Sequence, residues 1–277
     1  MMRVALCSEV IRGLPVDEQA RYAAALGYDG LEIAPFTLDG DAPHRLDSGK
    51  TTAVRRAVTD AGIVVSGLHW LLVAPPGLSI TSGDDAVRAQ TLEVMRGLVR
   101  LCADLGGRYL VHGSPAQRRL EPGHEADGRK RALDFLNEAA LAAAAVGVTY
   151  ILEPLSPDQT NFVTTVAEAA TIVGEIGSPA LRTMVDCSAA GTNETDTIPD
   201  LLRRHIPDGS VVHVHFNDPN RRGPGQGDLD FAPIVAALGR LSYGGWIGVE
   251  PFDYVPDGPG AAARAIGYVG GLRAALG

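Results

Sequence analysis

The sequence is poor in lysine and cysteine and contains no long apolar run. Among its 277 residues, 3 are cysteines, and the lysines are Lys50 and Lys130. Cys7, Cys102 and Cys187 lack metal-type spacing, and their odd number suits buried or free thiols in a reducing compartment better than a disulfide framework. No run approaches the roughly 18 apolar residues that a membrane span needs. The start MMRVALCSEVIRG also reaches a glutamate before a secretory apolar region forms. We therefore expect a cytoplasmic protein with no membrane partner.

Positive charge is also scarce. The chain has 33 Asp+Glu against 24 Lys+Arg, a formal net charge of -9, and 45% of its residues are hydrophobic. This composition is typical of a soluble globular protein and excludes disordered or collagen-like structure. Nucleic acid is disfavoured as a partner, because neutralising phosphates needs a basic face.

Apolar, β-branched runs alternate with stretches whose apolar residues repeat every three or four positions. The runs predict strands at 3–8, 30–35, 63–69, 108–112, 148–153, 181–186, 211–216 and 246–250. The other stretches predict helices at 16–27, 50–61, 84–105, a segment ending at 146, 165–177, 196–205, 230–239 and 258–275. Eight such units can close into a (β/α)8 TIM barrel of roughly 250 residues, so we expect one barrel domain over 1–277. An open doubly wound sheet is the alternative, but no Gly-x-Gly-x-x-Gly follows the first strand.

Ionisable side chains end four consecutive strands of this predicted barrel. They are Glu153, Asp186, His215 and Glu250. Functional groups of such barrels collect at the carboxyl ends of the strands, so we expect these four to meet. Three adjacent carboxylates repel one another unless a cation neutralises them, and an added imidazole makes a mixed oxygen and nitrogen site. A divalent metal is therefore expected: Mn²⁺ first, with Mg²⁺, Co²⁺ or Zn²⁺ as alternatives.

The motifs around these residues resemble a known group of barrels. They read ILEP at Glu153, MVDCS at Asp186, HVHFND around His215 with NRRGPGQGDLDF after it, and GVEPF at Glu250. They are similar to the sugar phosphate isomerase/epimerase superfamily, a xylose isomerase-like group that includes ketose 3-epimerases, hydroxypyruvate isomerases, inosose dehydratases and the endonuclease IV type of DNA repair enzyme. The ketose 3-epimerase resemblance implies the four metal ligands above and a substrate contact by Arg221.

Two positions depart from the 3-epimerase pattern. Ala189 stands where that pattern has a substrate-binding histidine, and Gln159 stands where it has a glutamate. A DNA endonuclease of the related type would need several more histidines, one of them at the position of Ala189. The departures alter the substrate contacts, and they leave a non-catalytic scaffold subunit as an alternative function.

The expected chemistry is isomerisation or epimerisation of a ketose or a related keto-polyol. A bound metal can chelate a carbonyl and an adjacent hydroxyl while Glu153 or Glu250 removes a proton, which gives a metal-bound enediolate. Proton return from the opposite face gives an epimer, and return at the neighbouring carbon gives an isomer. Elimination from the same species would make the protein a dehydratase or lyase. Imine chemistry would need a lysine at the end of an inner strand. We do not expect it, because Lys50 precedes a predicted helix and Lys130 lies within one.

Further residues are candidates for binding the sugar. His69 and His112 end the third and fourth strands, so each either lines the substrate cavity or is a buried structural histidine. Trp70 can form an apolar wall, and Gln159 is a candidate polar contact. Arg221 lies in a Gly/Pro-rich loop, where an arginine can bind a phosphate group, so a phosphorylated substrate is an alternative to a free sugar. The resemblance also makes a homo-oligomer, dimer or tetramer, an expected assembly.

Overall fold

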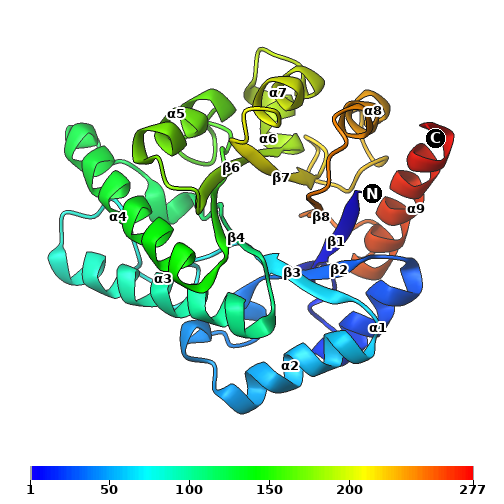
Figure 1. Cartoon of the computed structure of the whole chain (residues 1–277), viewed down its shortest axis with the longest axis horizontal. Helices are drawn as coiled ribbons and strands as arrows, with labels where there is room; N and C mark the ends of the chain where they lie inside the picture. Colours follow the sequence, from blue (N-terminus) through cyan, green and yellow to red (C-terminus); the bar gives the residue numbers. More distant parts are fainter. Residues whose placement is uncertain (1, 277) are drawn as a thin grey trace.

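Eight parallel strands close into a barrel in sequence order, as the repeating pattern predicts (Figure 1). The computed structural model describes residues 2–276 of the chain. The strands are β1 (Arg3–Cys7), β2 (Gly30–Ile33), β3 (Val64–Leu68), β4 (Tyr109–His112), β5 (Thr149–Leu152), β6 (Leu181–Asp186), β7 (Val211–Phe216) and β8 (Trp246–Val249). The barrel closes where β1 pairs with β8. The prediction of a (β/α)8 TIM barrel is confirmed.

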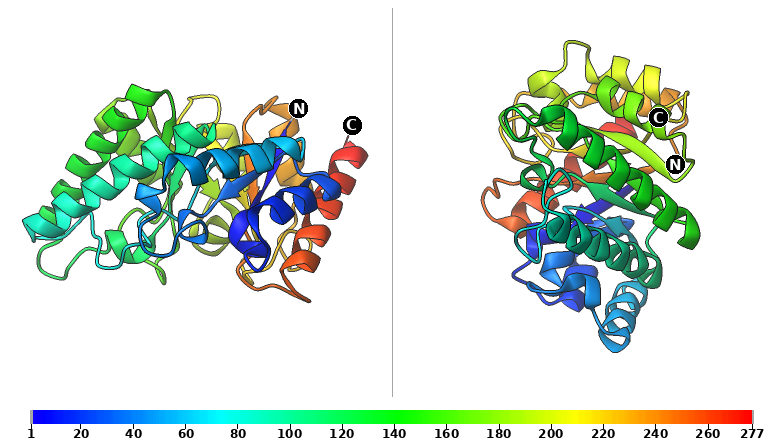
Figure 2. Two further views of the ribbon diagram at one scale, coloured as in Figure 1. Left: turned by 90° about the horizontal axis from the view of Figure 1, so that it is seen from below. Right: turned by 90° about the vertical axis from the view of Figure 1, so that its left-hand side faces the viewer.

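Helices surround the barrel, and α3 and α4 extend farther to one side than the others (Figure 2). The helices are α1 (Val16–Leu26), α2 (Ser48–Asp60), α3 (Asp85–Leu105), α4 (Glu125–Val146), α5 (Val166–Ile176), α6 (Cys187–Asn193), α7 (Ile198–His205), α8 (Ala232–Arg240) and α9 (Gly258–Leu276). Local signals set their ends. At α3, Asp84 accepts a hydrogen bond from the Ala86 amide at 2.7 Å, and Gly106 stops the helix with a φ of 84°. Within residues 2–276, no helix is long and apolar enough to cross a membrane.

The sequence did not predict α6, which begins immediately after β6. The Asp186 side chain accepts a hydrogen bond from the Ala189 amide at 2.7 Å, and this caps the first turn of the helix. One carboxylate therefore ends a strand and starts a helix. No loop of turn-forming residues separates β6 from α6, so the sequence gives no sign of where the strand ends and the helix begins.

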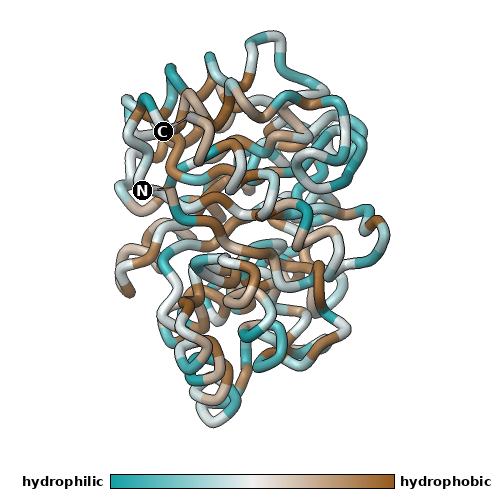
Figure 3. Tube along the Cα trace, turned by 90° about the vertical axis from the view of Figure 1, so that its right-hand side faces the viewer, coloured by the Kyte–Doolittle hydropathy of each residue, from teal (hydrophilic) through white to brown (hydrophobic). Residues whose placement is uncertain are grey.

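Apolar side chains fill both faces of the sheet, as expected for a parallel barrel covered by helices. The larger cluster lies between the strands and the helices. A smaller cluster joins side chains of five strands, which can meet only inside the barrel: Ala5, Tyr109, Val111, Ile151, Met184 and Trp246. Figure 3 shows hydrophobic segments through the middle of the molecule and hydrophilic ones along the outer helices and loops. The interior cluster forms the base on which the polar strand ends lie.

Candidate metal centre and active site

Four ionisable side chains from four strands meet at one end of the barrel. Glu153 follows β5, Asp186 ends β6, His215 belongs to β7 and Glu250 follows β8. Each residue is buried and offers one ligand atom, and these atoms all lie within 4.8 Å of one another. His215 Nδ1 lies 3.3 Å from Glu153 Oε1, 2.9 Å from Glu250 Oε2 and 3.9 Å from Asp186 Oδ2. The structure thus brings together the four residues that the sequence suggested as metal ligands.

The charges of this cluster are unbalanced without a cation. Burial and the neighbouring Glu153 raise the pKa of Asp186 to about 6. Burial also raises the pKa of Glu250 to about 7, although His215 opposes the rise. His215 Nδ1 is buried and has no hydrogen-bond partner despite its three carboxylate neighbours. Three carboxylate oxygens and an unpaired imidazole nitrogen around one point are a donor set that fits a divalent metal ion.

Hydrogen bonds hold the Asp186 carboxylate and the backbone of Glu153. Asp186 Oδ2 accepts a hydrogen bond from Asn217 Nδ2 at 2.6 Å. Arg118 is fully buried and donates from Nη1 to the Glu153 carbonyl oxygen at 2.6 Å. The short helical turn Pro115–Arg118 carries this side chain inside the protein. The Asp186 carboxylate and the backbone of Glu153 are therefore held by the protein itself.

Glu32 lies beneath the centre and was not recognised as part of it. Its Oε1 lies 2.9 Å from His215 Nε2, and its Oε2 lies 3.1 Å from His213 Nε2. Tyr109 also donates its hydroxyl to Glu32 Oε2 at 2.6 Å. Burial favours the protonated form, but His213 and His215 outweigh burial and hold the pKa of Glu32 well below its ordinary value. Glu32 thus lies behind His215, orients its ring and turns Nδ1 toward the cluster, as a carboxylate behind a metal-ligating histidine does.

A cavity of about 200 Å³ opens above the cluster, and Glu153, Asp186 and Glu250 line it. Trp70, Gln159 and Arg221 contribute to its walls, as the sequence suggested, together with Ser114 and Phe252. Trp70 packs edge-on against Phe252, with ring centroids 5.8 Å apart, and the Arg221 guanidinium lies 5.1 Å from the Phe252 ring centroid. Trp70 and Arg221 hold left-handed backbone conformations, with φ of 51° and 70°. Such strain in non-glycine residues is concentrated at functional sites.

Ala189 leaves the cavity without the imidazole that the epimerase pattern has there. Its amide is used in capping α6, and its side chain is a methyl group. Ser188 and Ser114 line the cavity, and the Ser114 hydroxyl is buried without a hydrogen-bond partner. These hydroxyls are the polar groups available to a sugar on this side.

Two predicted substrate contacts need correction. His112 does not reach the cavity, because Val111 points into the barrel and the next side chain of β4 must point outward. The His112 ring packs against Phe135 of α4, and its Nδ1 lies 2.9 Å from the Tyr150 hydroxyl oxygen. Burial and Arg118 lower the pKa of His112 to about 3, so it is a neutral structural residue. His69 also fails to line the cavity; it is fully buried behind Glu250, with Nε2 2.8 Å from Glu9 Oε2.

Gly113 offers a direct test of how closely Glu153 must be placed. A Cβ at this position would overlap Glu153 Oε2. We expect Gly113→Ala to displace the carboxylate and reduce turnover about 10²-fold, since a shift of about 1 Å in a reacting group has that effect. Gly83→Ala is the matched control, because no atom lies within 4 Å of the added methyl. Steady-state kinetics of both variants checks this expectation, and equal activities would contradict it.

Comparison with known proteins agrees with the barrel and its strand-end cluster. Residues 20–269 match the family described as xylose isomerase-like TIM barrel. The chain is 29% identical to an L-ribulose 3-epimerase of Mesorhizobium japonicum over 226 residues, 81% of this chain and 72% of that protein. It is 26% identical to a putative hydroxypyruvate isomerase of Streptomyces coelicolor, covering 95% of this chain and 93% of that protein.

Solved structures show the same fold. A 3-keto-D-glucoside 4-epimerase from E. coli superposes with a TM-score of 0.83 at 21% identity, covering 98% of this chain and 100% of that one. A D-psicose 3-epimerase structure gives a TM-score of 0.82 at 20% identity and covers both chains completely.

The fold and the strand-end cluster define a (β/α)8 barrel with carboxylates gathered at its mouth. The chain belongs to the xylose isomerase-like TIM barrel family. Its named relatives are epimerases and isomerases, and they support an enzyme of this class acting on a sugar.

Proposed function

We propose that the protein is a divalent-metal-dependent epimerase or isomerase of a ketose or a related keto-sugar. The observation that carries the proposal is the position of Glu153 and Glu250. They approach one imidazole nitrogen from β5 and β8, at 3.3 and 2.9 Å, beneath a cavity that is open to ligands. Two carboxylates that reach one bound carbon from different strands can remove a proton on one side and return it on the other.

Glu153, Asp186, His215 and Glu250 would hold the cation, and Mn²⁺ is the ion to test first because oxygen donors predominate. When bound, the cation polarises a carbonyl group and acidifies the carbon beside it. Asp186 and His215 act as ligands that the surrounding protein has already oriented. Glu153 would remove the proton on one side, and Glu250, which reaches the centre from β8, would return it on the other.

The cavity walls support a sugar as the substrate. Trp70 and Phe252 present aromatic surface to the apolar face of a sugar ring, and Ser114, Ser188 and Gln159 offer polar groups to its hydroxyls. Arg221 adds a cation at the mouth, where a hydroxyl-rich or phosphorylated end of the substrate would lie. Relatives named L-ribulose 3-epimerase, D-psicose 3-epimerase and 3-dehydro-D-guloside 4-epimerase support the same substrate class.

Proton exchange tests this proposal before the physiological substrate is known. The Mn²⁺-loaded protein is incubated in D₂O with free and phosphorylated ketoses and 3-keto-glycosides, and NMR follows the carbon next to the carbonyl. We expect deuterium at that carbon together with the epimer or isomer. Elimination products would assign a lyase instead, and an absence of exchange across the panel would favour a non-catalytic scaffold.

A further inference from the structure

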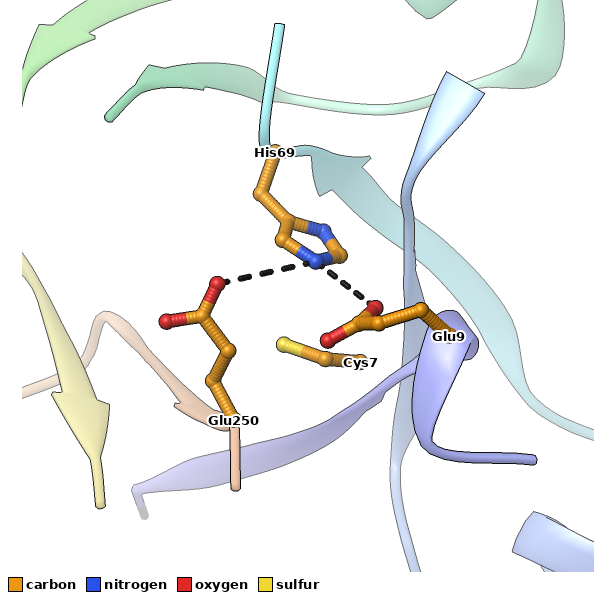
Figure 4. Close-up of side chains that lie close together, drawn as sticks. All are labelled: Cys7, Glu9, His69 and Glu250. Atoms are coloured by element: carbon orange, nitrogen blue, oxygen red, sulfur yellow. Dashed lines mark ion pairs between the residues drawn. The ribbon is translucent and has the colours of Figure 1, made fainter. Parts of the chain in front are cut away.

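A second group of buried metal-ligand side chains lies behind Glu250. Cys7 ends β1, Glu9 lies in the short helical turn Ser8–Ile11, and His69 follows β3. Figure 4 shows these three side chains and Glu250 pointing toward one another. One ligand atom from each residue lies within 4.8 Å of all the others, and all four residues are buried.

Hydrogen bonds within this group do not satisfy its polar atoms. His69 Nε2 lies 2.8 Å from Glu9 Oε2, yet both carboxylate oxygens of Glu9 and both ring nitrogens of His69 lack a hydrogen-bond partner. Burying such groups unpaired costs free energy. His215 Nδ1 shows the same combination of short distances and missing hydrogen bonds in the first cluster. These oxygen and nitrogen atoms lie close together without forming hydrogen bonds, which is how the ligand atoms of a shared cation are arranged.

Glu250 connects the two clusters through its two oxygens. Its Oε2 lies 2.9 Å from His215 Nδ1, and its Oε1 lies 3.7 Å from His69 Nε2. Glu32 lies behind both imidazoles, with Oε1 2.9 Å from His215 Nε2 and 3.8 Å from His69 Nδ1. Each histidine therefore presents one nitrogen to Glu32 and the other to a cluster of its own. Glu250, with one oxygen facing each cluster, is therefore placed as a carboxylate that bridges two metal ions would be.

We propose that Cys7, Glu9, His69 and Glu250 form a second divalent-metal site, which shares Glu250 with the first. A thiolate, an imidazole and two carboxylates suit Zn²⁺, Co²⁺ or Fe²⁺ better than Mg²⁺ or Ca²⁺. The site ties β1, β3 and β8 together and fixes the direction of Glu250. It goes beyond the proposed epimerase function and does not depend on it, since neither a substrate nor turnover enters the argument.

A proton on His69 is the alternative way to neutralise this group. Burial alone would lower the pKa of His69, but Glu9, Glu32 and Glu250 outweigh burial and raise that pKa to about 9. A protonated imidazole would require no metal and would leave Cys7 as a thiol. Because a bound cation deprotonates a thiol ligand, a spectroscopic signal from the sulfur separates the two states.

Cobalt titration of the metal-free, full-length protein under reducing conditions supplies that signal. We expect wild-type protein to bind two Co²⁺ per chain by equilibrium dialysis and to develop a near-ultraviolet thiolate-to-cobalt charge-transfer band. Cys7→Ser should abolish the band, and His69→Ala should lower the stoichiometry to one. Asp186→Asn should weaken the first site and keep the band. Cys187→Ser is the matched control, because this thiol is buried beside Asp186 and outside the second group.

Saturation of wild-type protein without a thiolate band would overturn the proposal, as would a band that persists in Cys7→Ser. A stoichiometry of two in His69→Ala would do the same. The wild-type measurement decides the question even if a variant fails to fold, and circular dichroism identifies such a variant. Neither the band nor the stoichiometry depends on activity, so this site and the proposed epimerase function can fail separately.

Discussion

Glu153→Gln and Glu250→Gln should each lower kcat by at least about 10³-fold while leaving the fold intact. General acid–base catalysis contributes about 10²–10⁴-fold, and each glutamine also removes a charged metal ligand. Kinetics at saturating Mn²⁺, with the metal content measured in parallel, separates the loss of the proton-carrying group from the loss of the cation. Circular dichroism checks the fold.

Glu138→Gln is the control, because Glu138 lies on the surface of α4 in an ion pair with Arg96 and does not line the cavity. Its kcat should equal that of the wild type. Deuterium exchange adds a finer test, since a variant that lacks one carboxylate should still exchange the proton facing the other. A kcat within tenfold of wild type in either active-site variant would contradict the two-carboxylate mechanism.

Glu32→Ala should lower the free energy of unfolding of the metal-free protein by about 3–5 kcal/mol, the usual result of removing one partner from a buried ionic group. The change leaves His213, His215 and the Tyr109 hydroxyl without their shared acceptor. Metal affinity should also fall about 10–100-fold, because the carboxylate behind a ligating histidine sets its orientation. Urea unfolding and metal titration measure the two effects.

Glu32→Gln is the informative companion, because it keeps the shape and two hydrogen-bonding groups but removes the charge. It should retain more of the stability than Glu32→Ala and still lose metal affinity. A loss of less than about 1 kcal/mol in Glu32→Ala would show that the contacts of Glu32 with His213, His215 and Tyr109 contribute little to stability.

The barrel and its strand-end cluster followed from local patterns. Strand and helix periods repeat eight times, and a parallel barrel places the carboxyl ends of its strands together. Glu153, Asp186, His215 and Glu250 could be selected because each stands at the end of an apolar run. No distance was needed for that step.

The supporting residues could not be recognised in the same way. Glu32 stands inside the apolar run GLEIAP, and only the closed barrel shows that two histidines and a tyrosine surround it. His112 was misplaced because one position along a strand reverses the direction of a side chain. Arg118 stands in a polar stretch of the sequence, and only the structure shows that it is buried against the carbonyl oxygen of Glu153, the residue after β5.

The apolar cluster inside the barrel determines from which side molecules reach the strand-end cluster. Tyr109, Met184 and Trp246 fill the space beneath Glu32, and the Arg3 guanidinium lies 4.4 Å from the Trp246 ring centroid on the same strand pair. The barrel is thus plugged on one side, and the cavity bordered by Trp70, Phe252 and Arg221 is the route to Glu153 and Glu250. In the proposed function, substrate and product would both pass through this cavity. Substitutions of Trp70, Phe252 or Arg221 should therefore slow the release of product as well as the binding of substrate. Product release, rather than proton transfer, can then limit turnover.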